Sequence, residues 1–96
     1  MVVAEISAFP IGEGESLSAS VAAAVKVIKE SGLKYQLGPM GTTVEGEWDD
    51  IMDLVTKCRN VLVESNNRVY MVLKIDERKD LKHGMAHKTG SVENKL

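Results

Sequence analysis

The sequence predicts an α+β fold in which a four-stranded antiparallel sheet carries two helices on one face. Two long segments repeat apolar side chains at helical spacing, and four shorter runs rich in β-branched residues flank them. The order strand, helix, strand, strand, helix, strand has its most economical right-handed solution in the ferredoxin-like sandwich, with strand order 4-1-3-2. A C-terminal extension follows, and the length of 96 residues predicts a single domain over residues 1–96.

The first strand is predicted over residues 2–9, which are rich in β-branched side chains and end at Pro10. Every even position of this segment is apolar, so the even positions are expected to face the helices. Residues 10–16 contain Pro, Gly and Ser, and this composition predicts a loop.

The first helix is predicted over residues 17–31, with Ser16 as its N-cap and Gly32 as a left-handed C-cap. Its apolar stripe consists of Leu17, Val21, Ala24, Val25 and Ile28. Alternation then predicts strands over residues 33–37 and 42–45, joined by a turn at 38–41.

The second helix is predicted over residues 48–63, and the polar segment from Ser65 to Asn67 is expected to terminate it. Its apolar stripe consists of Ile51, Leu54, Val55, Cys58 and Leu62. The last strand is predicted over residues 69–75. The tail after it is polar, and the sequence predicts at most a short C-terminal helix capped by Ser91.

The second face of the predicted sheet is half apolar. It carries Val3, Glu5, Ser7, Phe9, Tyr70, Val72 and Lys74. A solvated face would be more polar, so we expect a second copy of the chain to cover it, sheet on sheet. The alternative is that the tail from residue 77 onward folds over this face. Glu5 and Lys74 could pair across the ladder, or either could contact a ligand.

Charge and cysteine content exclude several classes of protein. The chain has 12 Lys and Arg against 14 Asp and Glu, a net charge of −2, which predicts no binding to nucleic acid or to anionic membranes. The single cysteine, Cys58, excludes an internal disulfide framework. No apolar run is long enough to span a membrane, and no signal peptide is recognisable, so we expect a cytoplasmic protein.

No residue pattern points to catalysis or to a resident metal or cofactor. His83 and His87 are four residues apart, but Gly84 and Gly90 argue against a helix that would bring them together as metal ligands. Cys58 lies on an apolar stripe and reads as a core residue. The segment from Gly12 to Gly14 lacks the cations of a phosphate-binding loop.

The stretch from Pro39 to Trp48 is the most distinctive segment. Thr42, Thr43 and Glu45 place two hydroxyls and a carboxylate close to the indole of Trp48. Such groups suit an aminopyrimidine, which offers an amino donor, ring-nitrogen acceptors and a flat face for stacking. The alternative is structural: two β-forming threonines, a solvated carboxylate and a tryptophan that plugs the core.

The whole chain resembles the thiamine-binding-protein-like family of small ferredoxin-like proteins. The matching pieces are Glu5-x-Ser7, Pro10-x-Gly12, Ser31-Gly-Leu33 with Tyr35, Pro39-Met-Gly-Thr42, Glu45-Gly46, Lys74-x-Asp76-x-Arg78 and Ser91-Val-Glu93. The resemblance implies a non-catalytic binder of thiamine or its hydroxymethyl-pyrimidine part. It also implies a homo-oligomer, usually a tetramer built as a dimer of dimers.

Carried onto this sequence, the resemblance implies a ligand site at Ser7, Pro10, Gly12, Thr42, Thr43, Glu45 and Trp48. Glu45 would accept a hydrogen bond from the pyrimidine amino group, Thr43 would orient that amino group, and Trp48 would flank the ring. The alternative function is a structural or regulatory homo-oligomer that has no small-molecule ligand.

Overall fold

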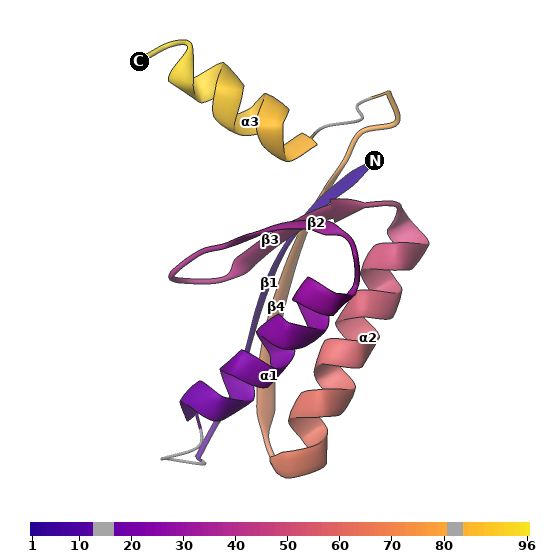
Figure 1. The fold of residues 1–96 in the computed structure, drawn as a ribbon, viewed down its shortest axis with the longest axis vertical. Coiled ribbons are helices and arrows are strands. Elements are labelled where there is room, and N and C mark those ends of the chain that lie inside the picture. Colours follow the sequence, from indigo (N-terminus) through magenta and orange to yellow (C-terminus); the bar gives the residue numbers. More distant parts are fainter. Residues whose placement is uncertain (13–16, 81–83) are drawn as a thin grey trace.

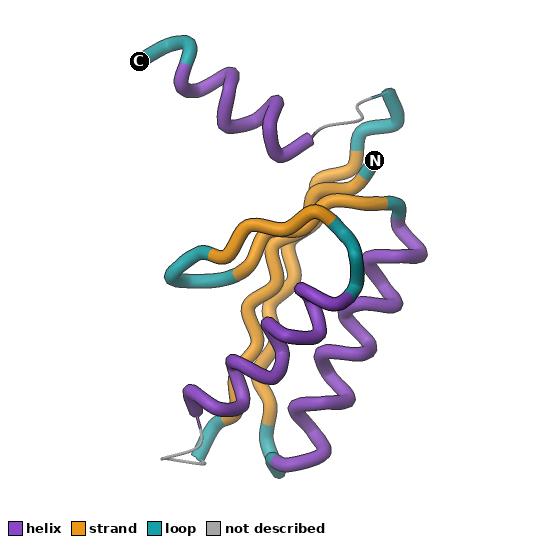
Figure 2. The backbone as a smooth tube through the Cα atoms, viewed as in Figure 1, coloured by secondary structure: helices purple, strands orange, loops and turns teal. Residues whose placement is uncertain are grey.

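A computed structural model describes residues 1–12, 17–80 and 84–96 of the chain. Its elements are β1 (Val2–Pro10), α1 (Leu17–Glu30), β2 (Lys34–Leu37), β3 (Thr42–Gly46), α2 (Trp48–Ser65), β4 (Val69–Glu77) and α3 (Gly84–Glu93). The strands form one antiparallel sheet in the order β2-β3-β1-β4, and α1 and α2 lie together on one side of it (Figures 1 and 2). The predicted ferredoxin-like topology is confirmed.

Strand register explains which side chains form the core. Ala4 of β1 lies opposite Val44 of β3 and Ile75 of β4, so even positions of β1 face the helices, as the alternation predicts. The buried cluster contains Val2, Ala4, Ile6, Ile28, Val44, Ile51, Leu54 and Cys58. The predicted stripe of α2 is therefore the stripe that the fold buries.

The two ends of α1 differ in what the structure describes. Gly32 follows the helix with φ of +79°, a left-handed conformation that confirms it as the C-terminal stop. The expected N-cap, Ser16, lies outside the described residues.

β1 is paired over unequal lengths on its two sides. It pairs with β4 from Val2 to Pro10 but with β3 only from Val2 to Ile6. The β3-facing edge of β1 is therefore unpaired beyond Ile6. Pro10, which has no N–H to donate, fits at the end of β1 because its nitrogen lies on this unpaired edge. The ladder to β4 continues past it, where the Ile11 N–H donates to the Arg68 carbonyl at 2.9 Å.

The tail contains a longer helix than the sequence predicts, which corrects two expectations. α3 begins at Gly84 and includes both Gly90 and Ser91, so Ser91 lies inside the helix instead of capping it. The two glycines, which argued against a helix here, are tolerated because α3 packs against β1 and β3. His87 is exposed on α3, and His83 lies outside the described residues.

We call the sheet face opposite α1 and α2 the outer face; it carries Val3, Glu5, Ser7, Phe9, Thr43, Glu45, Tyr70, Val72 and Lys74. α3 covers the end of this face near Val3 and Glu45. The other end, at Phe9, Tyr70 and Val72, stays exposed. The tail thus covers part of the face that was expected to meet a second copy.

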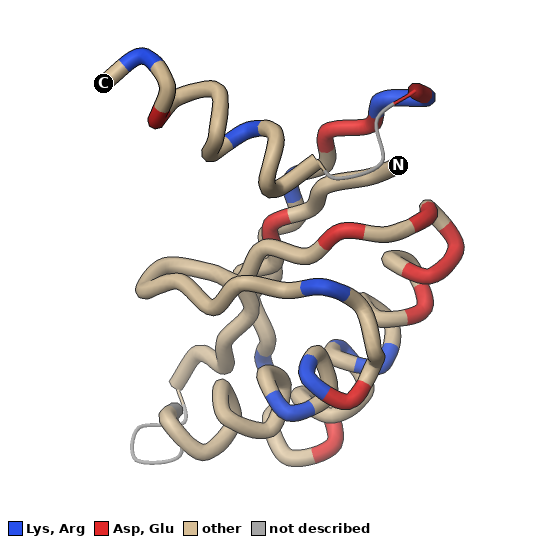
Figure 3. Tube along the Cα trace, turned by 45° about the horizontal axis from the view of Figure 1, so that its top comes forward, with Lys and Arg blue, Asp and Glu red and all other residues tan. Residues whose placement is uncertain are grey.

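Charged residues are spread over the molecule, but acidic residues gather where β3 leads into α2 (Figure 3). Asp49 and Asp50 lie in the first turn of α2, where the helix N-terminus stabilises negative charge. Among the described residues, no helix is long and apolar enough to cross a membrane.

Candidate functional site

Two cavities flank the turn at residues 38–41, one on each side of the sheet. The inner cavity, of about 280 Å³, lies between the sheet, the turn and α1. The outer cavity, of about 360 Å³, lies between the outer face, the turn and α3. The turn itself is closed by a hydrogen bond from the Gly38 N–H to the Gly41 carbonyl at 2.9 Å.

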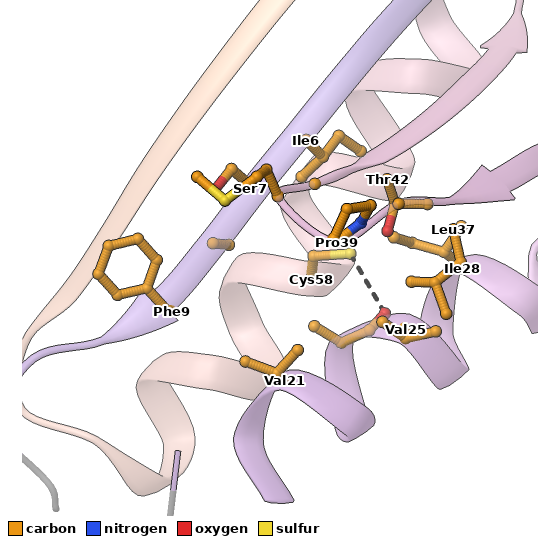
Figure 4. Close-up of a pocket in the computed structure, with 15 residues that line it drawn as sticks. Ile6, Ser7, Phe9, Val21, Val25, Ile28, Leu37, Pro39, Thr42 and Cys58 are labelled. Carbon is orange, nitrogen blue, oxygen red and sulfur yellow. Dashed lines mark hydrogen bonds between the residues drawn. The ribbon is translucent and has the colours of Figure 1, made fainter. Parts of the chain in front are cut away.

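The inner cavity has mostly apolar walls. Its lining includes Ile6, Ala8 and Phe9 of β1, Val21, Ala24, Val25 and Ile28 of α1, and Leu37, Pro39, Thr42 and Cys58. Figure 4 shows several of these side chains around one space. Thr42 is buried, and among the described residues its hydroxyl has no hydrogen-bond partner. This hydroxyl is available to a ligand.

Cys58 is buried and lines the inner cavity. Its thiol donates to the Ala24 carbonyl, with 3.7 Å between Sγ and O (Figure 4). Burial raises the pKa of this thiol to about 11, so it stays protonated near neutral pH. A protonated, hydrogen-bonded thiol is a poor nucleophile, which supports its interpretation as a core residue.

The outer cavity is more polar and is bounded by charged pairs. Glu5, Gln36 and Thr43 line it from the sheet, and Met85, Lys88 and Thr89 line it from α3. Glu5 and Lys74 form a cross-strand ion pair, one of the two roles that the sequence left open, with 3.4 Å between the carboxylate oxygen and Nζ.

Lys88 of α3 pairs with Asp76 of β4 at the margin of the outer cavity. The hydrogen bond and the charge of Lys88 lower the pKa of Asp76. Both side chains are half exposed, so solvent screens this pair.

Glu45 holds the start of α3 against the sheet. Its side chain is only 6% exposed; one oxygen accepts the Met85 N–H at 3.1 Å and the other lies 3.7 Å from Lys34 Nζ. A carboxylate at a helix N-terminus satisfies a free N–H and interacts favourably with the helix dipole. A Cβ at Gly84 would overlap the Val3 side chain, so only glycine allows this close approach.

The structure does not gather the seven predicted site residues in one place. Ser7 and Thr42 line the inner cavity, whereas Thr43 lines the outer cavity. Both oxygens of Glu45 are already engaged, one by the Met85 N–H and the other by Lys34 Nζ. Trp48 is the first residue of α2 and is 46% exposed. Neither it nor Pro10 nor Gly12 lines either cavity.

Several residues that line the cavities carry no polar side chain and were missed by sequence reasoning. They include Ala8, Val25 and Leu37 in the inner cavity and Met85 in the outer cavity. The usable signal was strand parity: neighbouring side chains on a strand point to opposite faces, and the structure places Thr42 at the inner cavity and Thr43 at the outer one. No group of three or more metal-ligating side chains occurs within residues 1–12, 17–80 and 84–96.

The amino-acid sequence is similar to those of several known proteins over almost the whole chain. The sequence profile of the family described as thiamine-binding protein matches residues 4–93. A UPF0045 protein of Methanothermobacter thermautotrophicus is 37% identical over 99 residues, covering 100% of both chains. A second UPF0045 protein, from Methanocaldococcus jannaschii, is 39% identical over 95 residues and covers 99% of this chain and 88% of its own.

Solved structures agree with the sequence matches. A hypothetical protein from Methanocaldococcus jannaschii superposes with a TM-score of 0.88 at 37% identity, covering 96% of this chain and 95% of its own. A candidate thiamine biosynthesis or salvage protein from Thermotoga maritima superposes with a TM-score of 0.78 at 31% identity, covering 92% and 97%. The family match and the full-length relatives together show that the chain belongs to the thiamine-binding protein family.

Proposed function

We propose that this protein binds thiamine, or its hydroxymethyl-pyrimidine part, in the inner cavity and does not transform it. Family membership supports the choice of ligand. The observation that carries the location is the hydroxyl of Thr42, a largely buried residue that lines an apolar cavity; this hydroxyl has no hydrogen-bond partner among the described residues.

The inner cavity matches the chemistry of a small heteroaromatic ring. Its volume of about 280 Å³ is close to the lower end of the usual range for ligand pockets, which begins at about 300 Å³. Apolar walls cover the faces of a ring, while a hydroxyl can donate to a ring nitrogen or accept from an amino group. An apolar groove lined by Val21, Val25 and Leu37 continues from the cavity along α1 and would take the rest of thiamine.

The lining of the inner cavity supports binding without catalysis. Among the described residues that line it, Cys58 is the only one with a titratable side chain, and burial keeps that thiol protonated. General acid–base catalysis requires a positioned group that exchanges protons near the working pH. The carboxylates closest in sequence, Glu5 and Glu45, belong to the outer face and are already paired.

Adjacent threonines on β3 provide a matched test of the site. Thr42→Val removes a hydroxyl from the inner cavity, and Thr43→Val makes the same change in the outer cavity. One neutral hydrogen bond contributes about 0.5–1.5 kcal/mol, so we expect Thr42→Val to weaken thiamine binding about 2–10-fold. Titration calorimetry with thiamine and with hydroxymethyl-pyrimidine measures both variants.

Each outcome of this titration has a distinct meaning. Unchanged affinity in Thr43→Val is the expected control result. Loss of affinity in Thr43→Val with no change in Thr42→Val would move the ligand to the outer cavity. No binding by the wild-type protein at millimolar ligand would overturn the proposed function and leave the structural or regulatory oligomer as the better hypothesis.

We further propose that the protein is a homo-oligomer, a tetramer built as a dimer of dimers. The supporting observation is the end of the outer face that α3 leaves uncovered, where Phe9 and Tyr70 stack with ring centroids 5.6 Å apart and Val72 is exposed. Contiguous exposed apolar side chains on a sheet are typical of an interface, and a second copy presents the same patch.

A charge placed in this patch should dissociate the oligomer. Tyr70→Glu puts a carboxylate where the second sheet would bury it unpaired, so we expect a smaller particle by light scattering after gel filtration. Tyr35→Glu is the matched control, because Tyr35 lies on β2 opposite Val44, with the side chains that face the helices. Identical masses for wild type and Tyr70→Glu would contradict this interface.

A further inference from the structure

We propose that the pyrimidine is recognised by the backbone of β1 at Ala8, whose N–H and C=O form an unpaired strand edge in the inner cavity. This inference rests on the proposed function and names the groups that read the ligand. None of them is a side chain, so neither residue type nor motif indicates them.

The hydrogen-bonding pattern of β1 establishes which way each backbone group points. Met1 and Arg78 exchange both of their hydrogen bonds, at 3.0 and 3.1 Å, and the Ile11 N–H donates to the Arg68 carbonyl. In an antiparallel pair such exchanges occur at every second residue. Odd-numbered residues of β1 therefore direct their backbone groups to β4, and even-numbered residues direct theirs to β3.

Ala8 is an even-numbered residue of β1 that lies beyond the start of β3. The pairing between the two strands stops at Ile6 and Thr42, the first residue of β3. The residues before Thr42, 38–41, form the turn and do not pair with β1. Among the described residues, the Ala8 N–H and C=O have no hydrogen-bond partner on this side. Ala8 lines the inner cavity together with Thr42.

The exposed edge at Ala8 is complementary to an aminopyrimidine. The amino group of the ring is a donor and the ring nitrogen beside it is an acceptor. The Ala8 N–H would donate to that nitrogen, and the Ala8 carbonyl would accept from the amino group, as in a paired residue of a sheet. Replacing the amino group by an oxo group reverses donor and acceptor. The edge therefore selects the aminated ring.

Proline at position 8 removes the proposed donor with little effect on the sheet. The Ala8 N–H takes no part in the ladder to β4, and Pro10 already occupies an equivalent position on the same edge. A proline also favours an extended conformation in the residue before it, which Ser7 already has. Glu77→Pro is the matched control, because the N–H of this odd-numbered residue lies on the outer edge of β4, away from the cavity.

The test compares the affinity for hydroxymethyl-pyrimidine with that for its deaminated oxo analogue. We expect the wild-type protein and Glu77→Pro to prefer the aminated ring by about tenfold or more, and Ala8→Pro to lose about tenfold in affinity together with most of this preference. Equal affinity of Ala8→Pro and wild type for the aminated ring would overturn the role of Ala8 and leave the proposed function standing. Absence of binding by wild type would instead overturn the proposed function.

A second measurement covers the case in which Ala8→Pro does not fold. In the wild-type protein, saturation with hydroxymethyl-pyrimidine should slow hydrogen exchange of the Ala8 amide, because that N–H becomes hydrogen-bonded. An unchanged exchange rate at Ala8 in the presence of bound ligand would contradict the proposed contact.

Discussion

Replacing Ile51 by alanine should lower the free energy of unfolding by about 2–5 kcal/mol. Ile51 has no exposed surface and belongs to the cluster that joins α2 to β1 and β3. Truncation removes buried methyl groups and leaves a cavity, and a chain of 96 residues has little stability to spare.

Thermal unfolding followed by circular dichroism measures this effect. For a domain of this size each kcal/mol corresponds to about 4–8 °C, so the midpoint should fall by roughly 10 °C or more. Val63→Ala is the control on the same helix, because Val63 is exposed, and its effect should stay within about 0.5 kcal/mol. Equal shifts in the two variants would contradict the assignment of the core.

The sheet and the two long helices were predictable because their signals are local. Alternation in β1 places Ala4 in the core, and the stripe of α2 places Leu54 and Leu62 there, as the structure confirms. α3 was not predictable in the same way, because its own sequence contains two glycines and little amphipathic pattern. It is held by contacts outside its own sequence, among them the hydrogen bond from the Met85 N–H to Glu45, which lies 40 positions earlier in the chain.

The candidate site was predictable only in part. The sequence indicates Thr42 as a ligand contact, and the structure places its hydroxyl at the inner cavity. Thr43, which the sequence grouped with Thr42, lies at the outer cavity because side chains alternate between the two faces of a strand. The edge at Ala8 arises because β3 begins only opposite Ile6, whereas β1 continues to Pro10. No single segment of the sequence encodes this difference in length between partner strands.

Glu45 has structural contacts that its sequence position did not indicate. The sequence indicated a carboxylate that binds ligand, whereas the structure engages both oxygens in holding α3 and Lys34. The same contact completes the outer cavity, because α3 supplies Met85, Lys88 and Thr89 to its wall. Removing the carboxylate should therefore act first on α3.

Glu45→Ala should release α3 from the sheet. The Met85 N–H loses a charged acceptor in a buried position, and hydrogen bonds to charged groups contribute about 1.5–3 kcal/mol. Since about 1.4 kcal/mol corresponds to a factor of ten, amide hydrogen exchange within residues 84–93 should accelerate about 10–100-fold. Exchange in β1 and α2 should change much less, because their contacts do not involve this carboxylate.

Glu47→Ala separates this effect from a general loss of negative charge. Glu47 lies two residues further along the chain, and its side chain is 74% exposed. Among the described residues it makes one ionic contact, at 4.0 Å from the terminal amino group. It should leave α3 as protected as in the wild type. If Glu45→Ala also leaves exchange in α3 unchanged, the helix must be held by its remaining contacts: the buried Met85 side chain, the close approach of Gly84 to Val3 and the Lys88–Asp76 pair. In that case Glu45 would be free to act on a ligand, as the sequence first indicated.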